Sequence, residues 1–130
     1  MVGIVVVSHS ALIAKGIVEL AGQMAQGVRI EAAGGTDEGG LGTDAGMIAA
    51  AIEAADDGDG VLVLVDLGSA VLSASMAIDD LVDGEVGART RIAEAPVVEG
   101  AVVAAVQAGA GDGLDAVAEA AAGAATMRKS

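Results

Sequence analysis

Several residue types that carry chemistry in other proteins are missing from this chain. It has no cysteine, no Phe, Tyr or Trp, a single proline and a single histidine, His9. The lack of cysteine excludes disulfides and thiolate metal sites, and it fits a cytoplasmic location. Because cysteine and tyrosine, which serve many proteins as nucleophiles or redox groups, are absent, His9 is the first candidate for covalent chemistry at neutral pH.

Basic residues and long apolar runs are also scarce. The chain has 6 Lys and Arg against 19 Asp and Glu, which gives a formal net charge of −13 at pH 7. This balance disfavours nucleic acid and anionic membranes as partners, and it favours a basic partner surface. No apolar run approaches the roughly 20 residues that cross a bilayer. No basic segment precedes the first apolar run, so we expect no export signal and a cytoplasmic protein.

Small and aliphatic residues dominate what is present. Hydrophobic residues make up 54% of the 130, and nearly all are Ala, Val, Leu or Ile. A chain of this length buries a real core, and no linker or shift in composition divides it. We therefore expect a single domain over residues 1–130, with no metal or other cofactor.

Short apolar runs and helical spacing alternate along the chain. Strands are predicted at residues 2–7, 28–33, 61–65 and 90–93, and helices at 11–24, 45–54, 70–82, 96–108 and 114–126. Ser10 is the predicted N-cap of the first helix, and Thr43 or Asp44 that of the second. Each of two helices has a predicted apolar side: Ile13, Ile17, Leu20 and Met24 in the first, and Val71, Ser75, Ile78 and Val82 in the third.

This alternation predicts an α/β fold with an open, mainly parallel four-stranded sheet. If the first helix lies on one face and the second on the other, strands two and three flank strand one, and the strand order is 2-1-3-4. The chain then changes direction between strands one and three, where such folds open a crevice at the carboxyl ends of the strands. His9 follows strand one and Asp66 follows strand three, so the topology makes neighbours of two residues 57 positions apart.

Groups suited to binding an anion are expected at the same edge. A glycine-rich loop follows strand two and contains Thr36 and Thr43, while Gly68 and Ser69 begin the third helix. Such loops and helix starts bind phosphate, although this loop is neither a P-loop nor a dinucleotide fingerprint. We predict that these four residues and Ser10 bind phosphoryl oxygens.

A histidine beside an aspartate at an anion site is suited to forming phosphohistidine. Neutral imidazole is nucleophilic near pH 7, and Asp66 would fix its tautomer by accepting the proton of one ring nitrogen. Simpler roles stay open at this point. His9 could simply cap or pack, and Asp66 and the Gly68–Ser69 pair could simply cap the third helix.

Four segments of the sequence resemble the DhaM family, the phosphotransfer subunits of phosphoenolpyruvate-dependent dihydroxyacetone kinases. They are Val7–Ser10, Ala33–Asp44, Asp66–Ala70 and Ala95–Ala101. The family has the fold of the IIA domains of the mannose-type sugar phosphotransferase system. The resemblance runs nearly end to end. It implies a phosphotransferase component that works only with partner proteins and forms a homodimer.

The resemblance also implies roles for single residues. His9 would accept a phosphoryl group from the phosphocarrier HPr and pass it to ADP held on DhaL, which with DhaK phosphorylates dihydroxyacetone. Asp66 and Ser69 match the aspartate and serine beside the histidine in mannose-type IIA domains. Sugar-transporting members typically have Thr-His-Gly and Asp-Thr-Trp-Gly-Gly-Ser-Pro where this chain has Ser-His-Ser and Asp-Leu-Gly-Ser. That difference favours the dihydroxyacetone system over sugar uptake. A non-catalytic regulatory module that binds an anion beside His9 stays open as a further alternative.

Overall fold

The computed structural model describes residues 1–130 and contains one four-stranded parallel sheet. The strands are β1 (Gly3–Ser8), β2 (Ile30–Gly34), β3 (Val61–Val65) and β4 (Thr90–Ile92). Their order is β2-β1-β3-β4, so β1 pairs with both β2 and β3. The predicted α/β class and strand order are confirmed.

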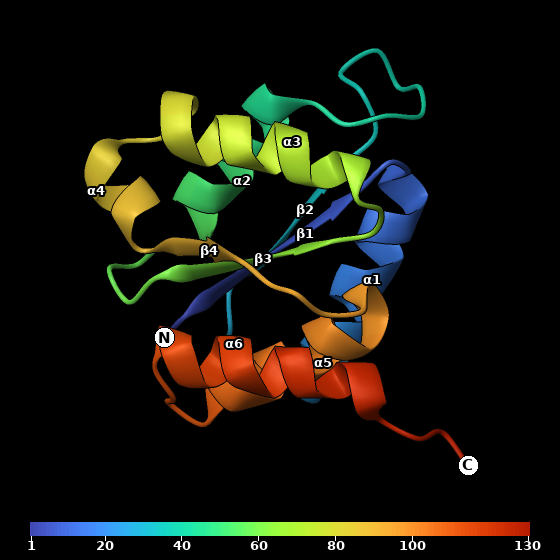
Figure 1. Ribbon diagram of the computed structural model, residues 1–130, viewed down its shortest axis with the longest axis vertical. Helices are drawn as coiled ribbons and strands as arrows, with labels where there is room; N and C mark the ends of the chain where they lie inside the picture. Colours follow the sequence, from blue (N-terminus) through green and yellow to red (C-terminus); the bar gives the residue numbers. More distant parts are fainter.

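Helices cover both faces of the sheet (Figure 1). One layer contains α1 (Ala11–Met24), α5 (Val97–Gly109) and α6 (Leu114–Gly123), which is followed by a 3₁₀ turn at Ala124–Thr126. The other contains α2 (Ala45–Ala55), α3 (Ser69–Met76) and α4 (Gly84–Ala88). The helices α1 and α2 therefore lie on opposite faces, as the predicted order requires, and α3 shares the face of α2.

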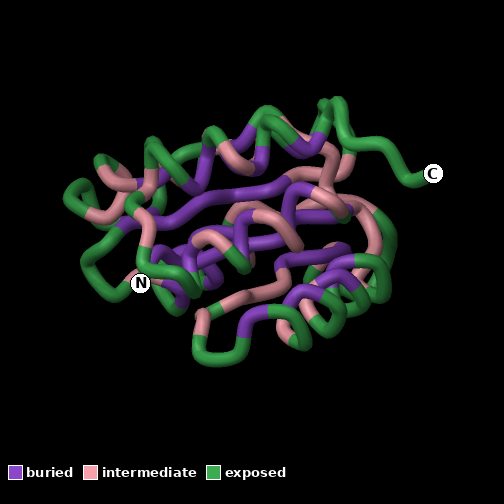
Figure 2. Tube along the Cα trace, turned by 90° about the horizontal axis from the view of Figure 1, so that it is seen from below, coloured by how far each residue is buried: buried purple, intermediate pink, exposed green.

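The two central strands are buried on both sides and separate two aliphatic cores (Figure 2). Side chains alternate along a strand. Ile4 and Leu62 therefore pack toward α1, α5 and α6, while Val5 and Val63 pack toward α2 and α3. This double burial explains why both strands are continuous apolar runs rather than alternating patterns.

The third predicted helix, over residues 70–82, is wrong in its second half. The α-helix ends at Met76 and widens into a π-helix over Ala77–Leu81. The Val82 N–H donates to the Ala77 carbonyl at 3.0 Å, and this wider turn brings Val82 into the core. The short α4 that follows was not predicted, because five residues are too few to show helical periodicity.

The predicted apolar sides of two helices are not the sides that face the sheet. In α1 the buried residues are Ala14, Ile17 and Ala21, whereas Ile13, Leu20 and Met24 are about half exposed. In α3 the buried residues are Ala70 and Ala74, and of the predicted set only Val82 is buried. Alanine lets a helix lie close to the sheet, so most of the buried residues of these two helices are small.

Candidate functional site

The candidate site is formed where two neighbouring strands end. Val7 of β1 is paired with Val65 of β3, and the next residues are Ser8 and Asp66. The Asp66 N–H donates to the Val7 carbonyl at 3.1 Å, which continues the ladder one residue past β3. His9 and Asp66 therefore emerge side by side at the edge of the sheet where α1 and α3 begin (Figure 1).

The imidazole of His9 is held at both nitrogens. Its Nδ1 lies 2.9 Å from Asp66 Oδ1, and its Nε2 lies 2.8 Å from Ser69 Oγ. An ionised carboxylate only accepts hydrogen bonds, so the neutral ring carries its proton on Nδ1. The lone pair is then on Nε2, where the Ser69 hydroxyl donates to it. About a quarter of the His9 side chain is exposed (27%), compared with 13% for Asp66.

Four donors surround the Asp66 carboxylate. Oδ1 accepts from His9 Nδ1 and from the Leu67 N–H at 2.7 Å. Oδ2 accepts from the Ser8 hydroxyl at 2.9 Å and from the His9 N–H at 3.0 Å. Burial raises the pKa of Asp66, but these hydrogen bonds outweigh it and hold the pKa below its usual range. An acceptor for Nδ1–H is therefore ionised at neutral pH.

The N-cap of α3 is Gly68 rather than Asp66, and no side-chain bond closes that cap. Asp66 thus does not serve as the simple helix cap that the sequence left open. Ser69, the first residue of the helix, uses its hydroxyl on His9. The N-terminal end of α3 begins beside the imidazole and favours an anion there, although the Ala70 and Val71 N–H groups already donate to the Leu67 and Gly68 carbonyls at 3.0 Å.

The other predicted phosphate-binding residues use their hydroxyls in local structure. Ser10 caps α1 as predicted, accepting from the Ile13 N–H at 3.3 Å. Thr36 accepts from the Gly40 N–H at 3.0 Å within its own loop. Thr43 Oγ1 lies 2.6 Å from Ser73 Oγ, and Asp44 is the cap of α2. Of the predicted set, the structure brings only Asp66 and Ser69 into contact with the His9 ring.

The glycine-rich loop is attached to the end of β1. The Gly35 N–H donates to the Ser8 carbonyl at 3.1 Å, and the Gly42 N–H donates to the His9 carbonyl at 2.8 Å. β2 begins two residues later than predicted and includes Gly34. A Cβ on Gly34 would lie 2.6 Å from the Ser10 carbonyl oxygen, so only glycine lets β2 approach the start of α1.

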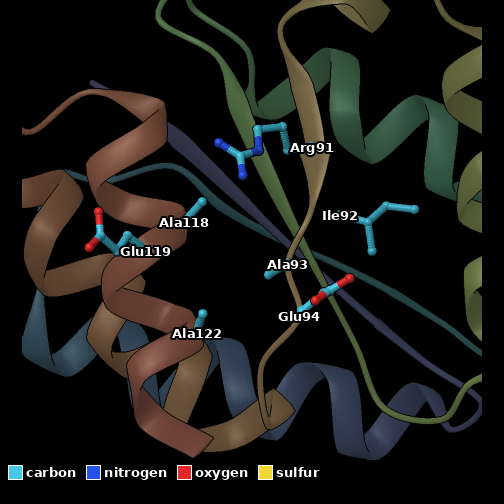
Figure 3. Close-up of a pocket in the computed structure, with 7 residues that line it drawn as sticks. All are labelled: Arg91, Ile92, Ala93, Glu94, Ala118, Glu119 and Ala122. Atoms are coloured by element: carbon cyan, nitrogen blue, oxygen red, sulfur yellow. The ribbon is translucent and has the colours of Figure 1, made fainter.

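The site is open rather than enclosed, which corrects the expected crevice. The two cavities of the structure lie elsewhere. One, of about 220 Å³, lies between β4 and α6 (Figure 3) and is lined by Arg91, Ile92, Ala93, Glu94, Ala118, Glu119 and Ala122. The other, of about 250 Å³, includes Met1 and Val2 at the opposite end of β1. Neither includes His9, so the chemistry of the ring identifies the site better than the shape of the surface does.

Three of the six Lys and Arg side chains form ion pairs, all away from the site. Their ion pairs are Arg89 with Asp56, Arg91 with Asp115 and Lys129 with Glu99. None forms a hydrogen bond or ion pair with His9, Asp66 or Ser69. No group of three or more His, Cys, Asp or Glu side chains is arranged to hold a metal ion. No helix combines the length and apolarity needed to cross a membrane.

Ser8, which belongs to the hydrogen-bond network around Asp66, was not predicted from the sequence. Ser8 is fully buried and bonds to both Asp66 Oδ2 and the Ser10 N–H. The only sequence pattern that could have indicated its role is a single hydroxyl residue at the end of an otherwise apolar strand. Only the pairing of β1 with β3 shows that this hydroxyl meets a carboxylate.

The fold and the site define the chain as a small, open, parallel α/β domain whose one histidine lies at the switch point between β1 and β3. The family model described as PTS system fructose IIA component matches residues 3–118, and the chain belongs to this family, EIIA-man.

Curated relatives name a more particular group. The chain is 45% identical over 123 residues to the PEP-dependent dihydroxyacetone kinase phosphoryl donor subunit DhaM of Klebsiella michiganensis, covering 92% of this chain but 26% of that protein. It thus spans about a quarter of that relative. It is 44% identical over 108 residues to the phosphoryl donor subunit DhaM of PEP-dependent dihydroxyacetone kinase 2 of Listeria innocua, covering 82% of this chain and 86% of that protein. A crystal structure of EF1359, a protein of unknown function, superposes with a TM-score of 0.86 at 37% identity, covering 97% and 96% of the two chains.

Proposed function

We propose that this chain is the phosphohistidine relay subunit of a dihydroxyacetone kinase, with His9 as the residue that carries the phosphoryl group. The observation that carries the proposal is the bond of 2.9 Å between His9 Nδ1 and Asp66 Oδ1. It fixes the ring with its lone pair on Nε2, which faces the hydroxyl of Ser69. A histidine that merely caps or packs has no need of an ionised partner on one nitrogen and a removable donor on the other.

In the first step, Nε2 attacks the phosphorus of a phosphohistidine on the donor, HPr. The new N–P bond forms as the donor's N–P bond breaks, and that electron pair returns to the donor nitrogen. The Nδ1 proton stays in place, so the phosphorylated ring is cationic and Asp66 stabilises it. The Ser69 hydroxyl, displaced from the lone pair, donates to a phosphoryl oxygen, as do the N–H groups that begin α3.

In the second step, a terminal phosphate oxygen of ADP bound to DhaL attacks the same phosphorus. The N–P bond breaks, the electron pair returns to Nε2, and ATP forms on DhaL for use with DhaK on dihydroxyacetone. Ser10, Thr36, Thr43 and Gly68 remain proposed phosphate ligands. The hydroxyls of Thr36 and Thr43 would have to exchange their present partners. The chain is proposed to act as a homodimeric, cytoplasmic component without a cofactor of its own.

The open position of His9 supports exchange with proteins rather than with a free small molecule. Small-molecule sites are usually concave and bury most of their ligand. Here the ring lies outside both cavities, on a surface that a second protein can cover. The site also has no cation of its own to balance a phosphoryl group, so a partner would supply it at the moment of transfer.

The direct test is phosphorylation by the carrier chain. The protein is incubated with phosphoenolpyruvate, enzyme I and HPr, and its intact mass is recorded with and without acid treatment. We expect a gain of one acid-labile phosphoryl group that is absent in His9→Ala. No gain with carriers of demonstrated activity would overturn the proposal.

The family description favours one rival, a IIA component for sugar uptake. The two functions share the first step and differ in the acceptor. Adding DhaL loaded with ADP to the phosphorylated protein separates them. Rapid loss of the phosphoryl group supports the kinase relay, whereas retention of it in the presence of active DhaL would favour sugar uptake.

A further inference from the structure

We propose that Ser8 is a positioning residue that fixes the tautomer of His9 by orienting Asp66. The proposal rests on the function proposed above for His9 and adds a residue to its machinery. Ser8 is the last residue of β1 and its side chain has no exposure to solvent. It touches neither the ring nor the position of the phosphoryl group, so it acts through the carboxylate.

The contacts of Ser8 give the carboxylate one orientation. The Ser8 hydroxyl donates to Asp66 Oδ2 at 2.9 Å, beside the His9 N–H at 3.0 Å. This pair holds Oδ2 inward, so Oδ1 faces His9 Nδ1 at 2.9 Å. Without the hydroxyl, Oδ2 keeps only the His9 N–H, while Oδ1 keeps the Leu67 N–H and His9 Nδ1. The carboxylate thus loses one of the four bonds that orient it, and it is held less firmly toward the ring.

Ser8 also ties together the two loops that form the site. Its oxygen accepts from the Ser10 N–H at 3.0 Å while its hydrogen points to Asp66. Ser10 begins α1 and Asp66 precedes α3, so one buried hydroxyl links the segment that carries the nucleophile to the segment that carries its partner. A hydroxyl is well suited to this place because it donates and accepts at once.

The consequence for the ring is chemical rather than merely structural. Nε2 is a nucleophile only while the proton is on Nδ1, and the bond to Asp66 is what holds it there. A carboxylate that turns away removes that preference. The ring then also populates the form with hydrogen on Nε2, which cannot attack phosphorus.

The chain offers a matched control for loss of a buried hydroxyl. Ser8 and Thr90 are its two buried polar residues, and the Thr90 hydroxyl donates to the Val86 carbonyl in α4 at 2.7 Å. Thr90→Val therefore removes a buried hydroxyl without touching the site. Ser8→Thr keeps the hydroxyl at position 8, whereas Ser8→Cys replaces it with a weak donor.

The test combines a tautomer measurement with a rate. Ring ¹⁵N chemical shifts of His9, the only histidine, report which nitrogen carries the proton, and quenched mass spectrometry gives the rate of phosphorylation by HPr. We expect Ser8→Ala to populate the Nε2–H form and to slow phosphorylation about tenfold, as loss of an outer hydrogen-bond partner does. Ser8→Thr should restore both, and Thr90→Val should change neither. If Ser8→Ala does not fold, Ser8→Cys against Ser8→Thr gives the same comparison.

The outcomes separate this proposal from the one it rests on. An unchanged tautomer in Ser8→Ala and Ser8→Cys overturns it, whatever the rate does, because a slower rate would then reflect a structural defect. An altered tautomer with an unchanged rate overturns it as well. If the wild-type protein takes no phosphoryl group but the tautomer still responds to Ser8, the relay function fails while the control of the ring by Ser8 stands.

Discussion

His9 illustrates how little the identity of a residue says about its chemistry. A histidine at a strand end is equally able to cap a helix, fill a gap or attack phosphorus. What separates these roles is which nitrogen carries the proton and whether the other is accessible. Here the bond of 2.9 Å to Asp66 places the proton on Nδ1, and the bond of 2.8 Å to Ser69 involves the lone pair on Nε2.

Replacing Asp66 tests this arrangement most directly. In Asp66→Asn, an amide NH₂ directed at the ring would favour hydrogen on Nε2, and the variant lacks the charge that stabilises the phosphorylated ring. We expect phosphorylation by HPr to slow at least about 100-fold, while the variant remains folded by circular dichroism. Asp44→Asn is the matched control, because asparagine caps a helix as well as aspartate does. Equal rates for Asp66→Asn and wild type would reduce Asp66 to a structural residue.

Among the secondary structure elements, the contact between β2 and α1 determines where the nucleophile lies. A Cβ on Gly34 would lie 2.6 Å from the Ser10 carbonyl oxygen and 2.8 Å from the Ala14 Cβ. We expect Gly34→Ala to displace the start of α1, to cost about 1–3 kcal/mol in the free energy of unfolding and to slow transfer. Urea unfolding and the phosphorylation rate measure the two effects.

Gly22, in the last turns of α1, provides the control for that substitution. A Cβ there meets nothing within 4 Å. Gly22→Ala should stabilise the protein by up to about 1 kcal/mol and leave the transfer rate unchanged, because alanine is the better helix former. If Gly34→Ala behaved like Gly22→Ala, close approach would not be the reason for glycine at position 34.

An ion pair between Arg89 and Asp56 joins the end of α2 to the start of β4. Arg89 donates to Asp56 through Nε at 3.0 Å and Nη2 at 2.7 Å, and this guanidinium lowers the pKa of Asp56. A carboxyl whose folded-state pKa is depressed adds stability above its unfolded pKa of about 4 and loses it as pH falls through the folded value. We expect Arg89→Ala to be less stable than wild type at neutral pH.

The difference between Arg89→Ala and wild type should begin to shrink as the pH falls below about 4 and should vanish below the depressed pKa of Asp56, where the carboxyl is protonated in both proteins. Urea unfolding of the two proteins across this pH range measures it. Arg91→Ala is the control, because its partner Asp115 is almost fully exposed (98%) and such pairs add little stability. A difference that does not depend on pH would mean that Arg89 acts through packing alone.

For the molecule as a whole, the net charge of −13 governs association. If the phosphoryl donor presents a basic surface, long-range attraction raises the rate of encounter, and salt screens it. We expect the KM for HPr to rise with ionic strength while kcat stays nearly constant, since salt affects encounter rather than the aligned imidazole. A KM that is independent of salt would assign the negative charge to solubility alone.

Much of the fold was predictable because it depends on local patterns. The apolar run of β3 and the helical spacing after Ser10 gave the elements, and their alternation gave the strand order. Which side of α1 and of α3 packs against the sheet was not predictable in this way. Alanines such as Ala14 and Ala74 are buried there, while larger apolar residues stay outside, and the choice depends on how closely a helix lies to the sheet.

His9 and Asp66 illustrate the same division within the site. Their placement at adjacent strand ends follows from chain order and the handedness of βαβ crossovers, so residues 57 positions apart were predicted as neighbours. The proton on Nδ1, the lone pair on Nε2 and the role open to Ser8 depend on distances of about 3 Å. Hydrogen bonds lose their strength within a fraction of an ångström, and patterns in a sequence do not resolve such distances. The sequence by itself thus predicts that His9 and Asp66 meet, and the folded structure decides which hydroxyls join them and what the imidazole is able to do.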